Sequence, residues 1–427
     1  MRLPILAILV ALGAALPLRA EAASRFSLSF QPREVIADIR VHGNQIATDD
    51  EVVALSGVKV GDVLGAETIA QIGARLRAAH RFETVQVLKR FASMDDASQI
   101  VLVLIVNEGP VSIGQQGHDG PITVKRRRGA GNLMFLPIID SEDGYGLTYG
   151  AVVAVPNVGG PKGRLGFPLS WGGERQAAAE YDRGFDSRVI TRAKVGVGIV
   201  ERTNPFYEID DTRRRVWGRV ERNTGPVRLG ATVGWQHVDF APESTSFPSV
   251  GADATLDTRL DPYLPRNAVF ATAKIERFFF SDGTSVDRHV YEARGYIGFV
   301  GQTVIVLRGL REDGSAPLRP YLKPLLGGIA NLRGFDAGFK TGDTLAAGSV
   351  EVRVPLTTPL SVGKIGVSVF MDTGAICNFG ERLSDQVRHS GAGGAVWLTA
   401  AMFHMSFSVA HGMGAHTRAQ FDIGFGF

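Results

Sequence analysis

The region from Asn132 to the C-terminus alternates between apolar and polar positions with a period of two. Segments 291–299, 349–354, 365–372 and 403–410 each place apolar residues at every second position and small or polar residues between them. This pattern is typical of strands with one apolar face and one polar face. At roughly 18 residues per strand and connection, the region predicts a transmembrane antiparallel β-barrel of about sixteen strands. A soluble sandwich with inward apolar faces is the alternative.

Residues 32–110 predict a separate α+β unit that begins with a strand and two helices. Apolar residues alternate over 35–41, which predicts a half-buried strand. Residues 48–57 contain a Thr-x-x-Glu capping box and end in a glycine, and this combination predicts a short helix. Apolar residues recur at helical spacing over 66–79, which predicts a second, amphipathic helix that lies on the sheet.

Two further strands complete this unit. The segment from Ile100 is apolar on both faces, which predicts a central strand, whereas the strand with Val85 and Val87 carries Lys89 and Arg90. We therefore expect the latter to be an edge strand protected by charge. An edge strand with Val85, Val87 and Lys89 is a candidate site for pairing with an extended client polypeptide. The alternative is a sheet that only spaces the barrel from its surroundings.

Composition and the N-terminal segment indicate export. Residues 1–22 combine Arg2, an apolar run and a small-x-small site, which predicts a secretory signal peptide. No later stretch reaches the roughly 18 apolar residues of a transmembrane helix, and Cys377 has no partner for a disulfide. An exported chain of this kind is either a soluble periplasmic protein or an outer-membrane barrel.

Residues 111–131 are rich in glycine and predict a linker between the two units. The linker contains the basic run 125–128, which is either a solvated segment or a contact for anionic lipid head groups. The net charge of the whole chain is only +3, so nucleic acid is not an expected partner.

One segment of the barrel region, 327–335, breaks the alternation and predicts a loop that fills the lumen. Arg333 lies among glycine and apolar residues, and a guanidinium carried into a confined space requires carboxylate partners. Glu351 and Asp372 lie on the polar faces of later predicted strands and are the candidate partners. The proposed loop-lock motif comprises Gly327, Gly328, Leu332, Arg333, Gly334, Phe335, Glu351 and Asp372.

The segment Leu332-Arg333-Gly334-Phe335 resembles a signature of the outer-membrane protein assembly-factor superfamily. These bacterial surface-antigen barrels include BamA, TamA and two-partner secretion transporters. Further landmarks of the family follow in order at 257–265, 348–355 and 370–374. The strand–helix–helix–strand–strand order of the N-terminal unit resembles a POTRA domain. The chain ends in a segment similar to the family's insertion signal, formed by Phe421, Ile423, Phe425 and Phe427.

Three features depart from the family pattern. The N-terminal region has room for one POTRA-like unit, whereas BamA has five, TamA three and the two-partner transporters two. Leu260 separates Asp261 from Arg259 in the Asp-Thr-Arg-Asp landmark, and Asn267 stands where we expect glycine. These differences favour a specialised relative rather than the central assembly machine.

The resemblance implies an outer-membrane barrel that inserts or translocates polypeptides, with the POTRA-like unit in the periplasm. Clients would be unfolded or extended, and a weak seam between the first and last strands would pass them on. Outer-membrane lipid and envelope accessory proteins are the further partners expected. The alternatives are a two-partner-type secretion transporter of one dedicated substrate, and a passive solute channel or structural barrel.

The sequence carries no motif that predicts an enzyme. A Gly-x-Ser-x-Gly elbow and a His-Glu-x-x-His zinc helix are both missing from it. His404, His411 and His416 are close in sequence, but their positions near a hairpin do not require them to converge on a metal. We therefore expect no catalytic residue, cofactor or metal.

Deleting Phe427 tests the C-terminal insertion signal. A terminal aromatic residue on the lipid face belongs to the interfacial girdle of a barrel, so its loss should impair insertion of the protein itself. We expect less of the variant in isolated outer membranes than of the wild type, measured by quantitative immunoblotting. Wild-type amounts of a folded barrel would contradict the prediction.

Overall fold

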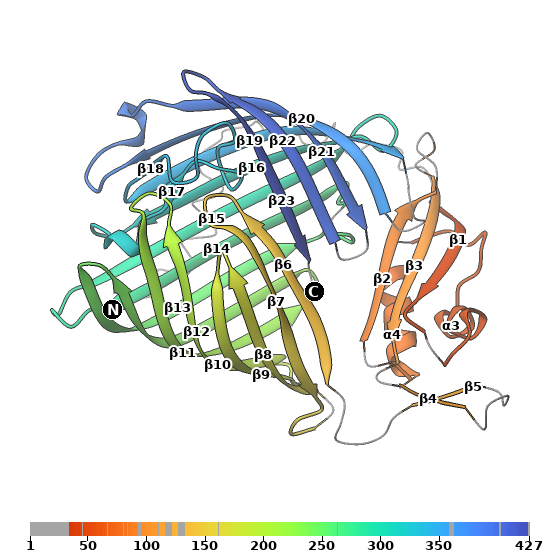
Figure 1. Cartoon of the computed structure of the whole chain (residues 1–427). Helices are drawn as coiled ribbons and strands as arrows, with labels where there is room; N and C mark the ends of the chain where they lie inside the picture. Colours follow the sequence, from red (N-terminus) through yellow and green to blue (C-terminus); the bar gives the residue numbers. More distant parts are fainter. Residues whose placement is uncertain are drawn as a thin grey trace.

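The computed structural model describes two units joined along the chain (Figure 1). It describes residues 34–108 except 45, 66, 80, 83, 93–95 and 97; residues 111–115 and 122–126; and residues 133–425 except 161, 263, 358–362 and 401–402. The predicted signal peptide and Phe427 lie outside these residues. Within them, no helix is both long and apolar enough to cross a membrane.

The N-terminal unit is a three-stranded sheet with two helices. Its elements are β1 (Val35–His42), α3 (Asp49–Ser56), α4 (Thr68–Ala78), β2 (Thr84–Phe91) and β3 (Gln99–Asn107). In the described part of this unit the strand order is β1-β3-β2, with β1 parallel and β2 antiparallel to β3. The predicted central strand is confirmed, and β2 lies at an edge.

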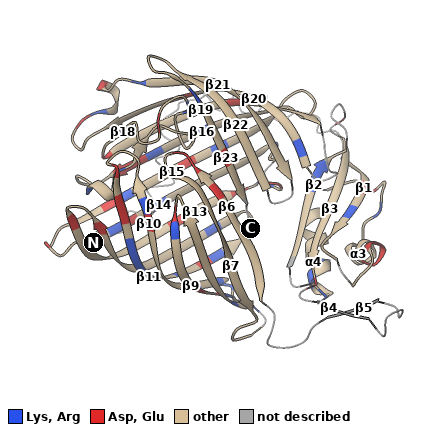
Figure 2. Ribbon diagram, in the orientation of Figure 1, with Lys and Arg blue, Asp and Glu red and all other residues tan. Residues whose placement is uncertain are grey.

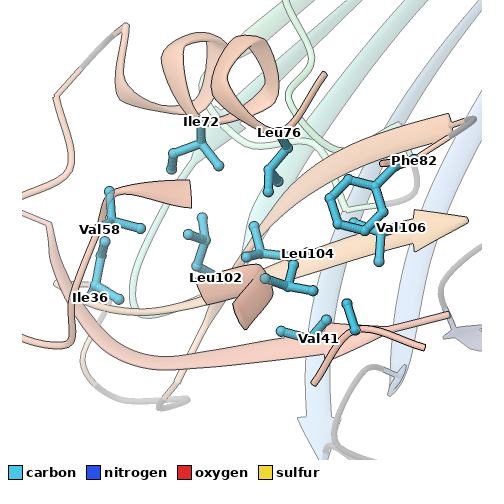
Figure 3. Packing of buried hydrophobic residues seen from close by; sticks show 11 residues of the cluster. Ile36, Val41, Val58, Ile72, Leu76, Phe82, Leu102, Leu104 and Val106 are labelled. Carbon is cyan, nitrogen blue, oxygen red and sulfur yellow. The ribbon is translucent and has the colours of Figure 1, made fainter. Parts of the chain in front are cut away.

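Apolar side chains from both helices and from the sheet form the core of this unit. Figure 3 shows Ile72 and Leu76 of α4 packed against Leu102 and Leu104 of β3, and all four are fully buried. The capping box of α3 is present, because Thr48 accepts a hydrogen bond of 3.2 Å from the backbone N–H of the residue at the third helical position. The predicted α+β class of this unit is therefore confirmed.

The predicted linker 111–131 contains regular structure. Strands β4 (Val111–Gln115) and β5 (Ile122–Arg126) pair as an antiparallel hairpin. Part of the predicted linker therefore has regular secondary structure.

The described residues of the C-terminal unit form a closed antiparallel barrel of sixteen strands, as predicted. Its strands are β6 (Met134–Glu142), β7 (Gly146–Pro156), β8 (Gly163–Gly172), β9 (Arg175–Gly184), β10 (Arg192–Asn204), β11 (Ile209–Thr224), β12 (Val227–Phe240), β13 (Glu243–Asp257), β14 (Ala268–Phe279), β15 (Ser285–Gly298), β16 (Val304–Gly314), β19 (Thr344–Thr357), β20 (Gly363–Cys377), β21 (His389–Ala400), β22 (Phe403–Gly412) and β23 (Thr417–Phe425).

The alternation of the sequence corresponds to the two faces of the barrel wall. On β20, Val369 and Met371 are 63% and 51% exposed on the outer face, whereas Asp372 is 2% exposed on the inner face. On β19, Glu351 is likewise on the inner face and 9% exposed. The lumen is thus lined by polar residues and the outside by apolar residues, the arrangement of a barrel in lipid.

The barrel closes between its first and last strands through a short contact. Among the described residues, the register of β6 and β23 consists of the pair Asp140–Gly424. The neighbouring pair β22 and β23 is in register from Phe403–Phe425 to His411–Thr417. Within the residues that the structure describes, the closure therefore has the shortest register of the strand pairs in the wall.

The turn between β13 and β14 explains why Asn267 stands where the sequence analysis expected glycine. Asn267 has a φ of +49°, the left-handed conformation for which glycine was expected, and asparagine tolerates it better than most residues. Its side-chain oxygen also accepts a 2.9 Å hydrogen bond from the Gly298 N–H. The backbone geometry of the turn is thus kept without glycine.

The same turn contacts the N-terminal unit. Asp261 forms an ion pair with Arg90 of β2, and both side chains are about 5% exposed or less. The guanidinium of Arg266 lies 5.6 Å from the ring centre of Phe91. Burial lowers the pKa of Arg90 to about 10. The sequence predicted that Arg90 protects a free sheet edge. In the structure, Arg90 instead holds β2 at this end of the barrel, which we call the mouth.

Removing one partner of the Arg90–Asp261 pair should loosen β2 from the mouth. Arg90→Met or Asp261→Leu alone removes one partner of a buried ion pair, which typically costs about 3–5 kcal/mol. The combined variant removes both charges and should recover most of the contact. We expect faster hydrogen exchange over 84–91 and 258–267 in each single variant than in the double variant. Wild-type exchange in both single variants would contradict this contact.

Candidate functional site

The candidate site is the long connection between β16 and β19, which folds into the barrel. It contains the 3-10 helix η2 (Pro320–Leu322) and the short paired strands β17 (Leu325–Leu326) and β18 (Lys340–Thr341). Leu332 is fully buried and Phe335 is 3% exposed. The inward-folded loop predicted from the sequence is therefore present.

Glycine lets the loop backbone approach the barrel wall. Gly334 has a φ of +92°, and a Cβ atom at this position would lie 2.7 Å from the backbone nitrogen of Gly412 in β22. A Cβ atom on Gly391 of β21 would lie 2.0 Å from the carbonyl oxygen of Arg333. A side chain at either position would move the loop away from the wall and displace the arginine that lies beside it.

Arg333 makes a forked contact with Asp372. Its Nε donates to Oδ2 at 2.7 Å, its Nη2 donates to Oδ1 at 2.8 Å, and its backbone N–H donates to Oδ2 at 3.0 Å. Two parallel bonds from a guanidinium to one carboxylate define the orientation of both groups. The structure thus brings together the two residues that the sequence analysis paired.

Three neighbours complete the surroundings of the Arg333 guanidinium. Its Nη1 donates to Glu351 Oε2 at 3.0 Å and its Nη2 to Ser349 Oγ at 3.1 Å. Its Cζ lies 3.4 Å from the centre of the Phe370 ring, a cation–π contact. Ser349 and Glu351 are neighbours on the inner face of β19, and Phe370 and Asp372 are neighbours on that of β20. Strand alternation therefore positions all four groups.

Apolar packing supports the ion pair. Leu326, Leu332 and Phe335 of the loop pack with Leu345 of β19 and Ile376 of β20 in one buried cluster. Because the side chains of Arg333 and Asp372 are only 14% and 3% exposed, loss of one would leave the other with a largely buried charge.

A second set of contacts holds the beginning of the loop and was missed by the sequence analysis. Leu318, Tyr321 and Leu322 pack in an aromatic cluster on the inner wall of β12 to β15. Arg213 Nη2 donates to the Tyr321 carbonyl at 2.6 Å, and Asp343 Oδ1 accepts from the Leu318 N–H at 2.7 Å. The sequence does contain a feature that could have predicted this cluster. Several strand ends carry phenylalanine at inward-facing positions, where alternation predicts polar residues. The wall residues of the cluster are Val238, Phe240, Phe247, Phe278, Phe280 and Val286.

The tip of the loop, which we define as residues 327–336, also contacts both strands that close the barrel. Asp143, which follows β6, accepts hydrogen bonds from the Ile329 N–H at 3.3 Å and from Gln420 Nε2 of β23 at 2.7 Å. Arg418 of β23 forms an ion pair with Asp336 of the loop. Movement of the tip would therefore remove contacts at the closure of the barrel.

Cavities lie on both sides of loop segment 329–331. One of about 510 Å³ extends toward the mouth and is lined by five arginines but only three carboxylates, and the other, of about 390 Å³, extends toward the opposite end. Figure 2 shows that acidic and basic positions occur along the barrel strands and not only at the turns. The loop thus divides a charged lumen.

The candidate client strand β2 presents its backbone to the outside of the sheet. Ala92 N–H, at the end of β2, donates to Gln99 O of β3. Because hydrogen-bonded and non-hydrogen-bonded pairs alternate in an antiparallel ladder, the N–H groups of Val85, Val87 and Lys89 point away from β3. Lys89 also donates to Glu34 at 2.8 Å, and the Val87 side chain packs on the core.

The remaining predicted residues are dispersed. On β23, Phe421 is 43% exposed on the outer face and Ile423 is half-buried, while the chain end at Phe427 is outside the described residues. His404 pairs with Asp422 at 3.1 Å, and His411 contacts the Thr417 hydroxyl at 3.0 Å. In the part of the chain that the structure describes, no group of three or more His, Cys, Asp or Glu is arranged to hold a metal.

Comparison with known proteins shows the class of this barrel. Residues 226–427 match the Omp85 superfamily domain. BamA from Haemophilus ducreyi lacking POTRA domains 1–3 has a similar structure, with a TM-score of 0.61 and 15% identity over 92% of this chain and 84% of that chain. CdiB from Escherichia coli has a TM-score of 0.51 and 12% identity over 94% of this chain and 92% of that chain. No curated protein matches the sequence.

Residues 226–427 therefore carry an Omp85 superfamily domain, and the C-terminal unit shares its barrel fold with BamA. The family resemblance read from the loop motif is confirmed, as is the fold class of an α+β unit followed by a barrel. The roles assigned to the loop-lock residues, the edge strand and the C-terminal aromatics remain predictions.

Breaking the pair of Arg333 and Asp372 should free the loop tip but not the base of the loop, residues 318–322. Arg333→Ala and Asp372→Ala each remove one partner of a buried pair, at a cost of about 3–5 kcal/mol to docking. We expect higher conductance in planar bilayers and faster hydrogen exchange over 327–335, with slow exchange retained over 318–322.

The double variant and a surface control make this test specific. Arg333→Ala/Asp372→Ala should resemble either single variant, because the second change removes a partner already lost. Arg311→Ala, which removes an exposed arginine from the neighbouring strand β16, should leave conductance unchanged. Additive effects of the two single changes would show that the residues act independently.

Proposed function

We propose that this protein inserts polypeptides into the outer membrane or translocates them across it. In this proposal the N-terminal unit lies in the periplasm and receives extended clients, and the inward-folded loop keeps the lumen closed until a client is engaged. The function rests on how the loop is held and on what its tip contacts.

The observation that carries the proposal is the shared contact between the loop tip and the closure of the barrel. Asp143 bonds both Ile329 of the loop and Gln420 of the last strand. The first and last strands themselves are in register, within the described residues, at Asp140–Gly424. Release of the tip would weaken an already short seam, so a client could displace the loop and open the wall in one event.

The edge of β2 supplies a means of client capture. Its outward N–H groups at Val85, Val87 and Lys89 match the backbone of an extended peptide, and pairing of this kind is indifferent to most side chains. The far end of the same strand is held at the mouth by Arg90 and Asp261. A captured strand would therefore lie beside the opening of the barrel.

Val87→Pro tests client capture in the cell. Proline removes an outward N–H of β2 while the bonds of the neighbouring residues to β3 remain. In cells depleted of the native protein, we expect the proline variant to fail to restore particular barrels or surface proteins in the outer-membrane proteome, whereas the wild type restores them.

Val87→Ala is the matched control, because it loses the same core packing but keeps the N–H group. It should restore the proteome, and the barrel of both variants should remain folded. Full restoration by Val87→Pro would contradict capture at this edge. An unchanged proteome on depletion, with altered solute uptake, would instead support a passive channel.

A further inference from the structure

A group of unpaired hydrogen-bond donors lies on the inner wall of β20 and β21 near the mouth. In the register of these strands Lys364 is opposite Thr399 and Gly366 is opposite Trp397. A Cβ atom on Gly366 would lie 2.1 Å from the Trp397 ring, so the indole lies over this glycine. The side chains of Lys364, Ser368, Trp397 and Thr399 are all at least nine-tenths buried.

Three of these residues have polar side-chain atoms without a hydrogen-bond partner in the described structure, and the fourth, Lys364, donates to a neutral acceptor. Within the described structure, Trp397 Nε1, Ser368 Oγ and Thr399 Oγ1 are buried without a hydrogen-bond partner. The Lys364 ammonium donates to the neutral amide oxygen of Gln302, and no carboxylate among the described residues forms an ion pair with it. Buried donors of this kind require acceptors from water or from a ligand.

The charge around Lys364 and Trp397 is positive. Lys364 lines a cavity of about 40 Å³ together with Arg90, Arg266 and Arg353. Arg266 donates to the carbonyl oxygens of Thr303 and Phe299 and not to a carboxylate of the described chain. The nearby carboxylates are already engaged, since Arg353 and Arg333 share Glu351 and Arg90 holds Asp261. Water supplies acceptors but no negative charge.

We propose that this cavity, between the N-terminal unit and the barrel mouth, binds one anionic group, either a carboxylate or a phosphate. A group of this size fits, because a single water needs only about 10–15 Å³ measured in this way. The anion would accept from the Lys364 ammonium and the Trp397 indole, which both line this cavity, whereas Ser368 and Thr399 line the larger cavity of about 510 Å³. Because Arg90 of β2 also lines the cavity, the bound anion would join the two units. This site goes beyond the proposed function and does not depend on it.

Calorimetric titration of the purified full chain in detergent tests the site. Sodium acetate is the carboxylate probe and inorganic phosphate the phosphate probe, with sodium chloride at equal ionic strength as the reference for screening. We expect saturable binding of at least one probe and none of chloride. Binding should weaken by about tenfold or more in Lys364→Met, because a charged hydrogen-bond donor is lost.

Two further variants make the test specific. Lys162→Met removes a lysine that lies at another turn, between β7 and β8, and should bind like the wild type. Trp397→Phe keeps every charge but removes the indole N–H from the cavity lining, so it should also weaken binding, which covers the case in which Lys364→Met fails to fold. Binding of acetate alone or phosphate alone would support the site and identify the anion. No saturable binding, or equal binding by wild type and all variants, would overturn it.

Discussion

The arrangement of the lumen depends on one buried charge. A guanidinium inside a barrel loses hydration, and in this protein two carboxylates, a hydroxyl and an aromatic ring replace it around Arg333. Each of these groups must face inward, which strand alternation on β19 and β20 ensures. The glycines of the loop and of the facing strands then allow the backbone to come close enough for the contact. Strand register, strand alternation and the positions of the glycines therefore all contribute to the contact between Arg333 and Asp372.

The loop is held by two kinds of interaction with different physical properties. The aromatic cluster around Tyr321 buries apolar area, which is insensitive to salt and has no directional requirement. The tip around Arg333 depends on paired charges with defined geometry. In the proposed function, a competing charged or hydrogen-bonding segment would therefore displace the tip while the base stays in place. This division would let the lumen change without unfolding of the whole loop.

Strand faces, the barrel class and the pairing of Arg333 with Asp372 could be predicted because they follow from periodicity along the chain. Contacts between strands far apart in sequence could not, since their relative positions depend on barrel closure and on the placement of the N-terminal unit. Arg90 was therefore interpreted as a solvent-facing charge, whereas it is buried against Asp261. The aromatic cluster and the unpaired donors near Lys364 likewise become visible only when separate strands are brought together.

The attachment of β2 to the mouth has a consequence for the rate at which a captured strand meets the barrel. A peptide paired to this edge would be held within one molecule, at an effective concentration on the order of millimolar for short connections. Weak backbone pairing, which many sequences can form, would then suffice for efficient delivery. If β2 captures clients as proposed, anchoring one end of this strand would replace affinity for the client with proximity to the opening.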